Sequence, residues 1–119
     1  MSSARPGHHT VTPRIFVDDV SAQVEFLRTV FDATGEVVEG RPADLRIGDS
    51  LVMVSASAER ERFPAFLYVY VDDVEETFRR AVSAGASGME APLDTPYGDR
   101  RAMVRDPHGN IFQIACALM

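Results

Sequence analysis

Two stretches of the chain carry hydrophobic residues at the spacing of a helix. In the first stretch they fall at i, i+4, i+7 and i+11, at Val20, Val24, Leu27 and Phe31. In the second stretch they fall at Val74, Phe78, Ala81 and Val82. Side chains at this spacing share one face of an α-helix, so we expect two amphipathic helices.

The residues that flank these stretches are typical of helix ends. Asp19 and Asp73 stand where an N-cap is needed, and Glu76 follows at the spacing of a capping box. Gly35 and Gly85 follow the two stretches and are natural helix stops. Each aspartate belongs to an Asp-Asp pair, and capping accounts for both pairs better than acid–base chemistry does.

The segments around the helices alternate between two kinds of side chain, which predicts strands. One face of these strands is apolar: Ile15, Val17, Leu67, Val69, Val71, Phe112, Ile114 and Cys116. The other face is richer in aromatic and polar groups: Thr12, Arg14, Phe16, Phe66, Tyr68, Tyr70 and Gln113. We expect the first set to pack under the helices and the second set to face away from them.

The chain contains an internal repeat. The segment Ile15–Val20 returns as Val69–Val74, at an offset of 54 residues. Each copy ends a strand, leads into a helix and is followed by a β-hairpin. The hairpins are Leu45–Ser55, turning at Gly48-Asp49, and Ala102–Cys116, turning at Asp106–Asn110.

This repeat predicts one α+β domain of two tandem β-α-β-β-β modules, about 12–55 and 66–116, joined by a connector at 56–65. Residues 1–9 are expected to form a flexible N-terminus, and 10–119 the single domain. A four-stranded sheet with helices on one side leaves its other face bare. Two such faces can curl toward each other, so we expect a cup-shaped, curved mixed sheet with the helices outside.

Composition excludes several partners. The chain of 119 residues has a formal net charge of −6. Nucleic acids and anionic membranes both need a basic surface, so neither is expected as a partner. No apolar stretch approaches the roughly 20 residues that span a bilayer, and the N-terminus lacks the apolar run of a signal peptide. Cys116 is the only cysteine, which fits a reducing compartment, and we expect a cytoplasmic protein.

Three short segments add to the repeat. Pro96–Arg100 contains an aromatic-Gly-Asp-Arg motif, and Val104–Asn110 contains an Asp-Pro-x-Gly-Asn turn. Leu45–Ser50 forms the start of the first predicted hairpin and its turn. Together they resemble small bacterial members of the vicinal oxygen chelate superfamily, which includes glyoxalase I, bleomycin resistance proteins and extradiol dioxygenases. The resemblance covers the chain from Thr10 onward and implies the two-module cup.

The resemblance also implies a test for a metal site. Members that use a divalent metal hold it with histidine and carboxylate side chains, one from each of four strands. These places correspond to Thr12, Met53, Phe66 and Gln113 in this sequence. A phenylalanine cannot bind a metal, a thioether is too soft for such a site, and the other two are weak donors. We therefore expect no metal, no cofactor, and neither glyoxalase I nor extradiol dioxygenase activity.

The remaining residues of metal-binding or nucleophilic type are expected to be structural. His8 and His9 belong to the N-terminal tail, where we expect solvation. His108 lies in the Asp-Pro-His-Gly turn, and Cys116 alternates with residues expected to be buried. Catalytic residues are therefore left unassigned.

The strand face turned away from the helices has the composition of an organic-ligand site. Aromatic rings give stacking area, methionine adapts to irregular shapes, and arginine pairs with anions or rings. The candidate ligand-binding residues are Thr12, Arg14, Phe16, Met53, Phe66, Tyr68, Tyr70, Tyr97, Met103 and Gln113. We expect a small aromatic or amphipathic ligand, such as a natural product or an antibiotic, in a cup at the sheet or dimer interface. The resemblance to the bleomycin resistance branch implies sequestration by a homodimer.

Two alternatives remain open. One is a metal-independent lyase, isomerase or hydrolase acting on a small organic metabolite, with Tyr68, Tyr70, Arg14 or Asp99 carrying the chemistry. The other is a dimerisation module whose cup is filled by its own side chains. The sequence does not distinguish pairing of the modules within a chain from exchange between chains.

Overall fold

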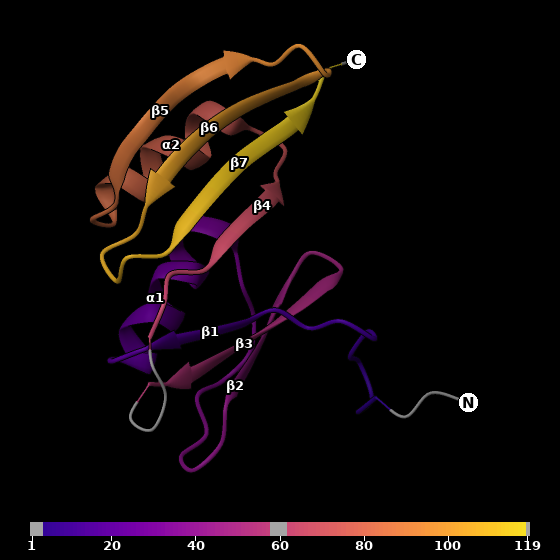
Figure 1. The fold of residues 1–119 in the computed structure, drawn as a ribbon, viewed down its shortest axis with the longest axis vertical. Coiled ribbons are helices and arrows are strands. Elements are labelled where there is room, and N and C mark those ends of the chain that lie inside the picture. The colour runs from indigo at the N-terminus through magenta and orange to yellow at the C-terminus, as the bar shows by residue number, and fades with distance from the viewer. Residues whose placement is uncertain (1–3, 58–61, 119) are drawn as a thin grey trace.

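The computed structural model describes residues 4–57 and 62–118. The first half contains β1 (Arg14–Val17), α1 (Val20–Phe31), β2 (Ala43–Ile47) and β3 (Ser50–Ala56). The second half contains β4 (Phe66–Tyr70), α2 (Val74–Ser83), β5 (Ser87–Asp94), β6 (Asp99–Arg105) and β7 (Ile111–Ala117). This is the α+β arrangement expected from the internal repeat (Figure 1).

The described strands form two sheets, one in each half. Sheet A has the order β1-β3-β2, and sheet B has the order β4-β7-β6-β5. In both sheets the first strand of the half pairs in parallel with the last strand, and the other pairs are antiparallel. This shared topology confirms the two-module fold. In Figure 1, α2 lies behind sheet B, and α1 lies behind the junction between the sheets.

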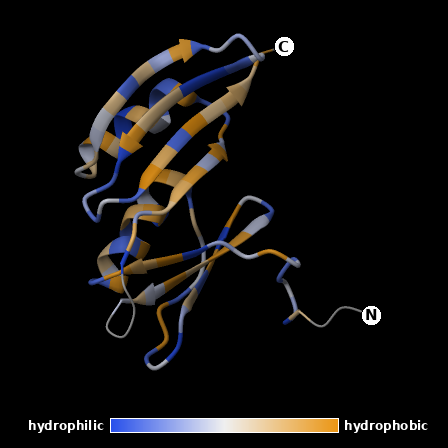
Figure 2. Cartoon of the chain, viewed as in Figure 1, coloured by the Kyte–Doolittle hydropathy of each residue, from blue (hydrophilic) through white to orange (hydrophobic). Residues whose placement is uncertain are grey.

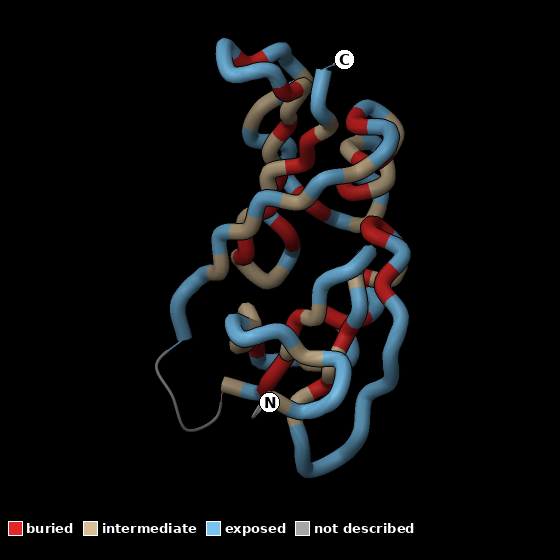
Figure 3. Tube along the Cα trace, turned by 90° about the vertical axis from the view of Figure 1, so that its right-hand side faces the viewer, coloured by how far each residue is buried: buried red, intermediate tan, exposed pale blue. Residues whose placement is uncertain are grey.

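The first module has three strands where the repeat predicts four. The segment after α1 forms a single bridge, between Thr34 and Arg46, and residues 34–41 are all exposed (Figure 3). Gly35 and Gly40 have φ values of 132° and 84°, which are incompatible with a regular strand. The equivalent segment of the second module is the full strand β5, so the two sheets differ in size.

Both helices begin at the expected aspartates. The Asp19 carboxylate accepts a hydrogen bond from the Ala22 backbone N–H at 3.0 Å, and the Asp73 carboxylate accepts one from the Glu76 N–H at 3.0 Å. The Glu76 side chain pairs with Arg79 on the same helix, so only the forward half of the expected capping box is seen.

The expected stop is correct for α2 and wrong for α1. α2 ends at Ser83, and Gly85 follows with φ 105°. α1 ends at Phe31, because Asp32 takes the left-handed conformation that terminates a helix, with φ 56°. Gly35 has another role: it lies against β2, where a Cβ atom would overlap a backbone carbonyl oxygen.

The apolar strand faces and the helices form one core. As expected, the buried strand residues include Ile15, Val17, Phe112 and Ile114. α1 reaches both sheets, since it contacts β2 and β3 and places Phe26 and Phe31 with ring centres 6.1 and 5.3 Å from that of Phe112. Both helices also carry hydrophilic residues (Figure 2). No helix in the described ranges is long and apolar enough to cross a membrane.

A buried polar network joins α1 to the turn between β6 and β7. Gln23 is fully buried; its Nε2 donates to Asp106 Oδ2 at 2.8 Å, and its Oε1 accepts from Asn110 Nδ2 at 3.0 Å. Asp106 Oδ1 accepts the backbone N–H groups of His108 and Asn110, both at 2.9 Å. Asn110 Oδ1 accepts the Ala65 N–H at 2.9 Å. The Asp-Pro-His-Gly-Asn turn therefore ties the two modules together, and we call Gln23, Asp106 and Asn110 the module lock.

Candidate functional site: an aromatic sheet face around Asp99

The face of each sheet that is turned away from the helices is called the open face here. On sheet B, β4 presents Phe66, Tyr68 and Tyr70, which are 59%, 36% and 64% exposed. In the register of the sheet, Tyr68 pairs with Gln113 of β7, which pairs with Met103 of β6. Because paired residues share a face, these five predicted ligand-binding residues lie together on the open face.

The three tyrosines of the chain gather around one carboxylate, and two of them contact it directly. The Tyr68 and Tyr70 hydroxyls donate to Asp99 Oδ2 at 2.6 and 2.9 Å, and the Tyr97 hydroxyl lies 3.1 Å from that of Tyr68. Asp99 is 6% exposed, and Ala115, on β7 between β4 and β6, is fully buried. The Tyr68 and Tyr70 side chains therefore extend from β4 across β7 to reach Asp99 on β6. We call Tyr68, Tyr70, Tyr97 and Asp99 the tyrosine cluster.

The turn before β6 positions the carboxylate. Thr95 Oγ1 accepts from the Asp99 backbone N–H at 3.0 Å and donates to the Asp99 carbonyl oxygen at 2.9 Å. Gly98 has φ 97°, a conformation that favours glycine in a tight turn. The aromatic-Gly-Asp motif found in the sequence thus places both Tyr97 and Asp99 in the cluster.

Arg101 and Glu90 extend the cluster across the sheet, and neither was among the predicted site residues. Arg101 Nη1 donates to the Tyr97 hydroxyl at 3.0 Å, and its Nε and Nη2 donate to Glu90 Oε1 at 3.1 and 2.9 Å. Strand alternation was the available signal for Arg101, since Asp99, Arg101 and Met103 share one face of β6. Figure 2 shows the hydrophilic start of this strand next to the C-terminus.

The cluster changes the pKa of all three tyrosines: it raises the pKa of two and lowers the pKa of the third. Partial burial and the hydrogen bond to Asp99 raise the pKa of Tyr68. The hydrogen bond to Asp99, with partial burial, raises the pKa of Tyr70. Hydrogen bonds with the Tyr68 hydroxyl and the Arg101 guanidinium lower the pKa of Tyr97. Two phenols are therefore held protonated, and Tyr97 is the tyrosine that ionises first.

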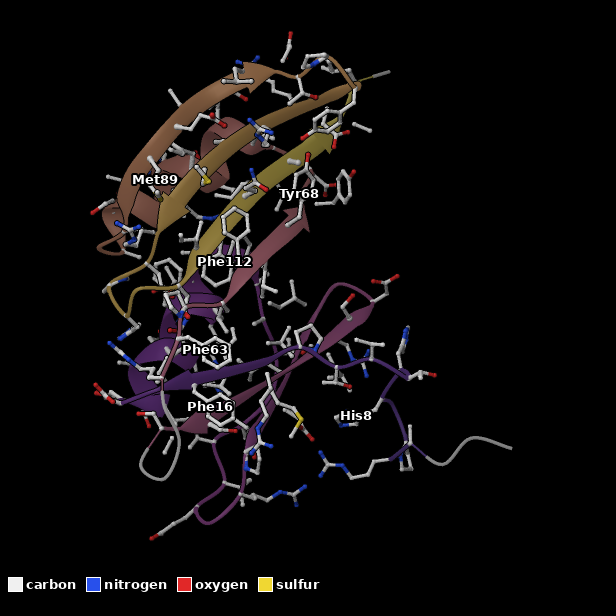
Figure 4. The ribbon with its side chains drawn as sticks, viewed as in Figure 1. His8, Phe16, Phe63, Tyr68, Met89 and Phe112 are labelled. Carbon is white, nitrogen blue, oxygen red and sulfur yellow. The ribbon has the colours of Figure 1, made fainter. Side chains whose placement is uncertain are left out.

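The other predicted ligand-binding residues lie on sheet A. Arg14 Nε donates to Ser55 Oγ at 2.9 Å, and its guanidinium carbon lies 5.0 Å from the centre of the Phe16 ring, a cation–π contact. Met53 pairs with Arg14 in the sheet and shares its face. Among the described residues, no hydrogen bond or ring contact joins this group to Tyr68 and its neighbours on sheet B (Figure 4).

The expectation that His8 lies in a solvated tail is wrong. Its side chain is 8% exposed, with Nε2 3.2 Å from Asp44 Oδ2 and Nδ1 3.4 Å from Thr12 Oγ1. Arg5 also pairs with Asp44, at 3.2 Å. The N-terminal segment therefore lies against sheet A beside the predicted ligand residue Thr12, whereas His9 is exposed as expected. Only the tertiary structure brings Asp44 to this segment, so the local sequence carried no signal for the contact.

The places that correspond to metal ligands do not fit a divalent ion. Thr12 and Met53 belong to the first module, and Phe66 and Gln113 to sheet B. Phe66 has no donor atom, and a thioether does not suit an ion held by oxygen and nitrogen. Across residues 4–57 and 62–118, no group of three or more histidine, cysteine, aspartate or glutamate side chains is placed to hold a metal ion.

Two further residues of reactive type lie outside the cluster. His108 is half-buried in the β6–β7 turn, and its carbonyl oxygen accepts a bond from Arg62 at 3.4 Å. Cys116 is half-buried, not buried as expected, because it lies near the end of β7, where the sheet is less covered. Neither contacts the tyrosine cluster through a hydrogen bond in the described structure.

The fold and the open face define a two-module α+β protein with an exposed aromatic surface on sheet B. The sequence profile of the Glyoxalase/Bleomycin resistance protein/Dioxygenase superfamily matches residues 7–114, and the chain belongs to this superfamily. A Mycobacterium tuberculosis (strain H37Rv) protein is 28% identical over 125 aligned residues, covering 87% of this chain and 72% of that protein. The anthracycline biosynthesis protein DauV of Streptomyces sp. (strain C5) is 50% identical over 44 residues, covering 37% of this chain and 16% of that protein.

Solved structures show the same architecture. TioX from Micromonospora sp. ML1 superposes with a TM-score of 0.79 at 27% identity, covering 92% of this chain and 99% of that one. A glyoxalase/bleomycin resistance protein/dioxygenase family enzyme from Burkholderia phytofirmans PsJN superposes with a TM-score of 0.78 at 25% identity, covering 90% and 97%. These matches confirm the fold over nearly the whole chain.

Proposed function

We propose that the chain binds and sequesters a flat aromatic or amphipathic organic molecule on its open faces, without a metal ion. The exposed aromatic row of β4, formed by Phe66, Tyr68 and Tyr70, carries this proposal. A contiguous exposed patch of large apolar groups is typical of an interaction or ligand-binding site. Aromatic rings offer a large stacking area to a flat ligand.

The tyrosine cluster suits stacking. The phenol protons of Tyr68 and Tyr70 are both directed to Asp99, which fixes the orientation of the two rings. Rings that are already fixed lose little conformational entropy when a ligand binds. The half-buried Met103 and Gln113 beside them supply one adaptable contact and one polar contact.

The relatives support the ligand class. DauV is described as an anthracycline biosynthesis protein, and anthracyclines are flat, fused-ring aromatic compounds. The superfamily to which the chain belongs includes bleomycin resistance proteins, and bleomycin is also an aromatic natural product. We propose antibiotic resistance by sequestration as the physiological role. The lone Cys116, which has no disulfide partner in the chain, suits action in the cytoplasm.

We also propose that two copies complete the site. A single chain keeps the ligand-type residues of sheet A apart from those of sheet B, and both open faces remain partly exposed. A second copy that sets its sheet A against sheet B of the first would enclose a ligand between them. Sedimentation should then give twice the chain mass of 13.1 kDa, and a monomer at working concentrations would contradict this part of the proposal.

Calorimetric titration with an anthracycline tests the binding function. We expect a dissociation constant below roughly 100 µM, and about tenfold weaker binding for Tyr68→Ala, since one stacking ring is lost. Val82→Ala is the matched control, because Val82 is an exposed apolar residue on α2, away from the open face. If neither the anthracycline nor a panel of other aromatic natural products binds in this range, the proposal is wrong.

The buried carboxylate beside three phenols favours one alternative, a metal-independent isomerase, lyase or hydrolase. Here Asp99 would act as the base and Tyr97, whose pKa is lowered, as the proton-transfer group facing solvent. Incubation with a bound ligand, followed by mass spectrometry, distinguishes the two functions. Conversion that Asp99→Asn abolishes would establish the enzyme, and recovery of unchanged ligand would support sequestration.

A further inference from the structure

A cavity lies between the two modules, alongside β4. It has a volume of about 690 Å³ and is bordered by the end of α1, the β2–β3 hairpin, β4 and the start of α2. Figure 1 shows the hairpin projecting beside the end of β4. The volume lies within the range of small-molecule sites. We call this cavity the module cleft.

The inner wall of the module cleft is apolar. Leu67 and Val69 of β4 and the next residue, Val71, line it from the strand face that packs toward the helices. Tyr68 and Tyr70 of the same strand also border the cleft. In the internal repeat, Val69 and Val71 correspond to Ile15 and Val17, which are 1% and 0% exposed. Val69 and Val71 are only half-buried. The same strand positions are therefore covered in the first module and open to the cleft in the second.

The border of the module cleft is acidic. Asp32, Asp49, Asp72 and Asp73 line it, and all four are exposed. None of them forms a salt bridge within the described residues. Asp32 and Asp73 cap helices, whereas Asp49 and Asp72 have no such role. Two carboxylates are therefore left at the cleft with neither a cationic partner nor a capping function.

Arg80 is the single basic residue among those that line the cleft. Its Nη2 donates to the Val30 carbonyl oxygen at 3.1 Å, at the C-terminal end of α1, where a cation is favoured. Its Nε is buried and has no acceptor within the described structure. Four aspartates outweigh this one guanidinium, so the cleft is net negative. An acceptor oxygen on a ligand would satisfy the free N–H, which is costly to leave unpaired.

We propose that the module cleft is a second binding site, for a cationic aromatic molecule. The aromatic body lies against Leu67, Val69 and Val71, and the positive group lies at Asp49 and Asp72. The apolar wall provides the driving force, and the acidic border selects the sign of the charge. The cleft shares Tyr68 and Tyr70 with the tyrosine cluster, but its apolar wall and its acidic border are formed by other residues, so this proposal does not rest on the function proposed above.

A pair of fluorescent probes of matched shape tests the charge preference. 9-Aminoacridine is planar and cationic at neutral pH, and acridine-9-carboxylate is planar and anionic. We expect the full chain at about 0.1 M ionic strength to bind the cationic probe at least about ten times more tightly. The difference should shrink when the ionic strength is raised to about 1 M, since exposed charges are then screened.

Matched variants locate the probe. Asp49→Asn with Asp72→Asn should weaken 9-aminoacridine binding about three- to tenfold, because two attractive charges are lost. Glu36→Gln with Glu39→Gln removes the same net charge from an exposed segment that does not line the cleft, and should change binding less than about twofold.

A blocking substitution separates this site from the open face. Ser50 is exposed at the hairpin border of the cleft, so Ser50→Trp should fold and abolish probe binding. Met103→Trp obstructs the open face of sheet B and should leave probe binding unchanged. The proposal is overturned if Met103→Trp abolishes binding and Ser50→Trp does not, or if the two probes bind equally. It is also overturned if Ser50→Trp converts a dimer to a monomer in sedimentation, since a second copy then fills the cleft.

Discussion

Replacing Gln23 tests whether the module lock holds the two sheets in one arrangement. Gln23→Met keeps nearly the same side-chain volume and removes both hydrogen-bonding groups. The change leaves Asp106 Oδ2 and Asn110 Nδ2 without these partners, in residues that are only 3% and 1% exposed. Because both residues are buried, bulk water can replace the lost bonds only through a structural opening.

The magnitude follows from these two unpaired groups. A buried donor or acceptor left without a partner costs about 1–3 kcal/mol. Part of the penalty is offset because methionine is more apolar than glutamine and Asp106 keeps two backbone donors on Oδ1. We therefore expect the free energy of unfolding to fall by about 2–4 kcal/mol. In a chain of this length that lowers Tm by roughly 8–16 °C.

Urea unfolding followed by circular dichroism measures the loss. Ser21→Met places the same side chain at an exposed position of α1 and should stay within about 0.5 kcal/mol of the parent. A double-mutant cycle with Asn110→Ala should give a coupling energy of at least about 0.5 kcal/mol. A Gln23→Met variant that unfolds with the parent, or a cycle with no coupling, refutes the reasoning.

Three further predictions concern local contacts. The chain has three tyrosines and no tryptophan, so absorbance titration reads the tyrosines cleanly, and Asp99→Asn should move the titration of two of them to lower pH. Because these two phenols have a raised pKa in the folded state, their contribution to stability is present below about pH 10 and is lost as the pH rises above it. Asp99→Asn should therefore reduce this loss of stability at alkaline pH. Asp73→Ala should lower the free energy of unfolding by about 1 kcal/mol through the lost N-cap, whereas Asp72→Ala should change it by less than about 0.5 kcal/mol in the same urea assay. Gly35→Ala should destabilise by at least about 1 kcal/mol more than Gly40→Ala, because both have positive φ but only Gly35 has a backbone oxygen where the Cβ would lie; equal losses would contradict the close approach.

The parts of the fold that depend on local patterns were predictable. The repeated Val-Asp-Asp-Val segments give each module a strand end, an N-cap and a helix start within a few residues. Strand alternation placed Phe66, Tyr68 and Tyr70 on the face away from the helices, where they are found. These predictions are correct because each feature depends only on residues that are neighbours in the sequence.

The predictions that were wrong depend on backbone conformation at particular glycines or on contacts between distant segments. The segment after α1 forms one bridge in place of the fourth strand expected from the repeat, because Gly35 and Gly40 take positive φ values. His8 is covered because Asp44 lies beside it in space. The burial of Gln23 was equally invisible, since its partners are in a turn more than eighty residues away.

The geometry of the tyrosine cluster bears on the choice between binding and catalysis. A general base needs a free lone pair aimed at the substrate proton, at hydrogen-bond distance. Asp99 Oδ2 already accepts two phenol protons, and the residue is 6% exposed, so this oxygen is occupied and the carboxylate offers little exposed surface to a substrate. The Tyr68 and Tyr70 side chains, by contrast, are both exposed at the surface of the sheet. In the arrangement described here, the carboxylate orients the aromatic rings, and this favours a protein that holds its ligand over one that transforms it.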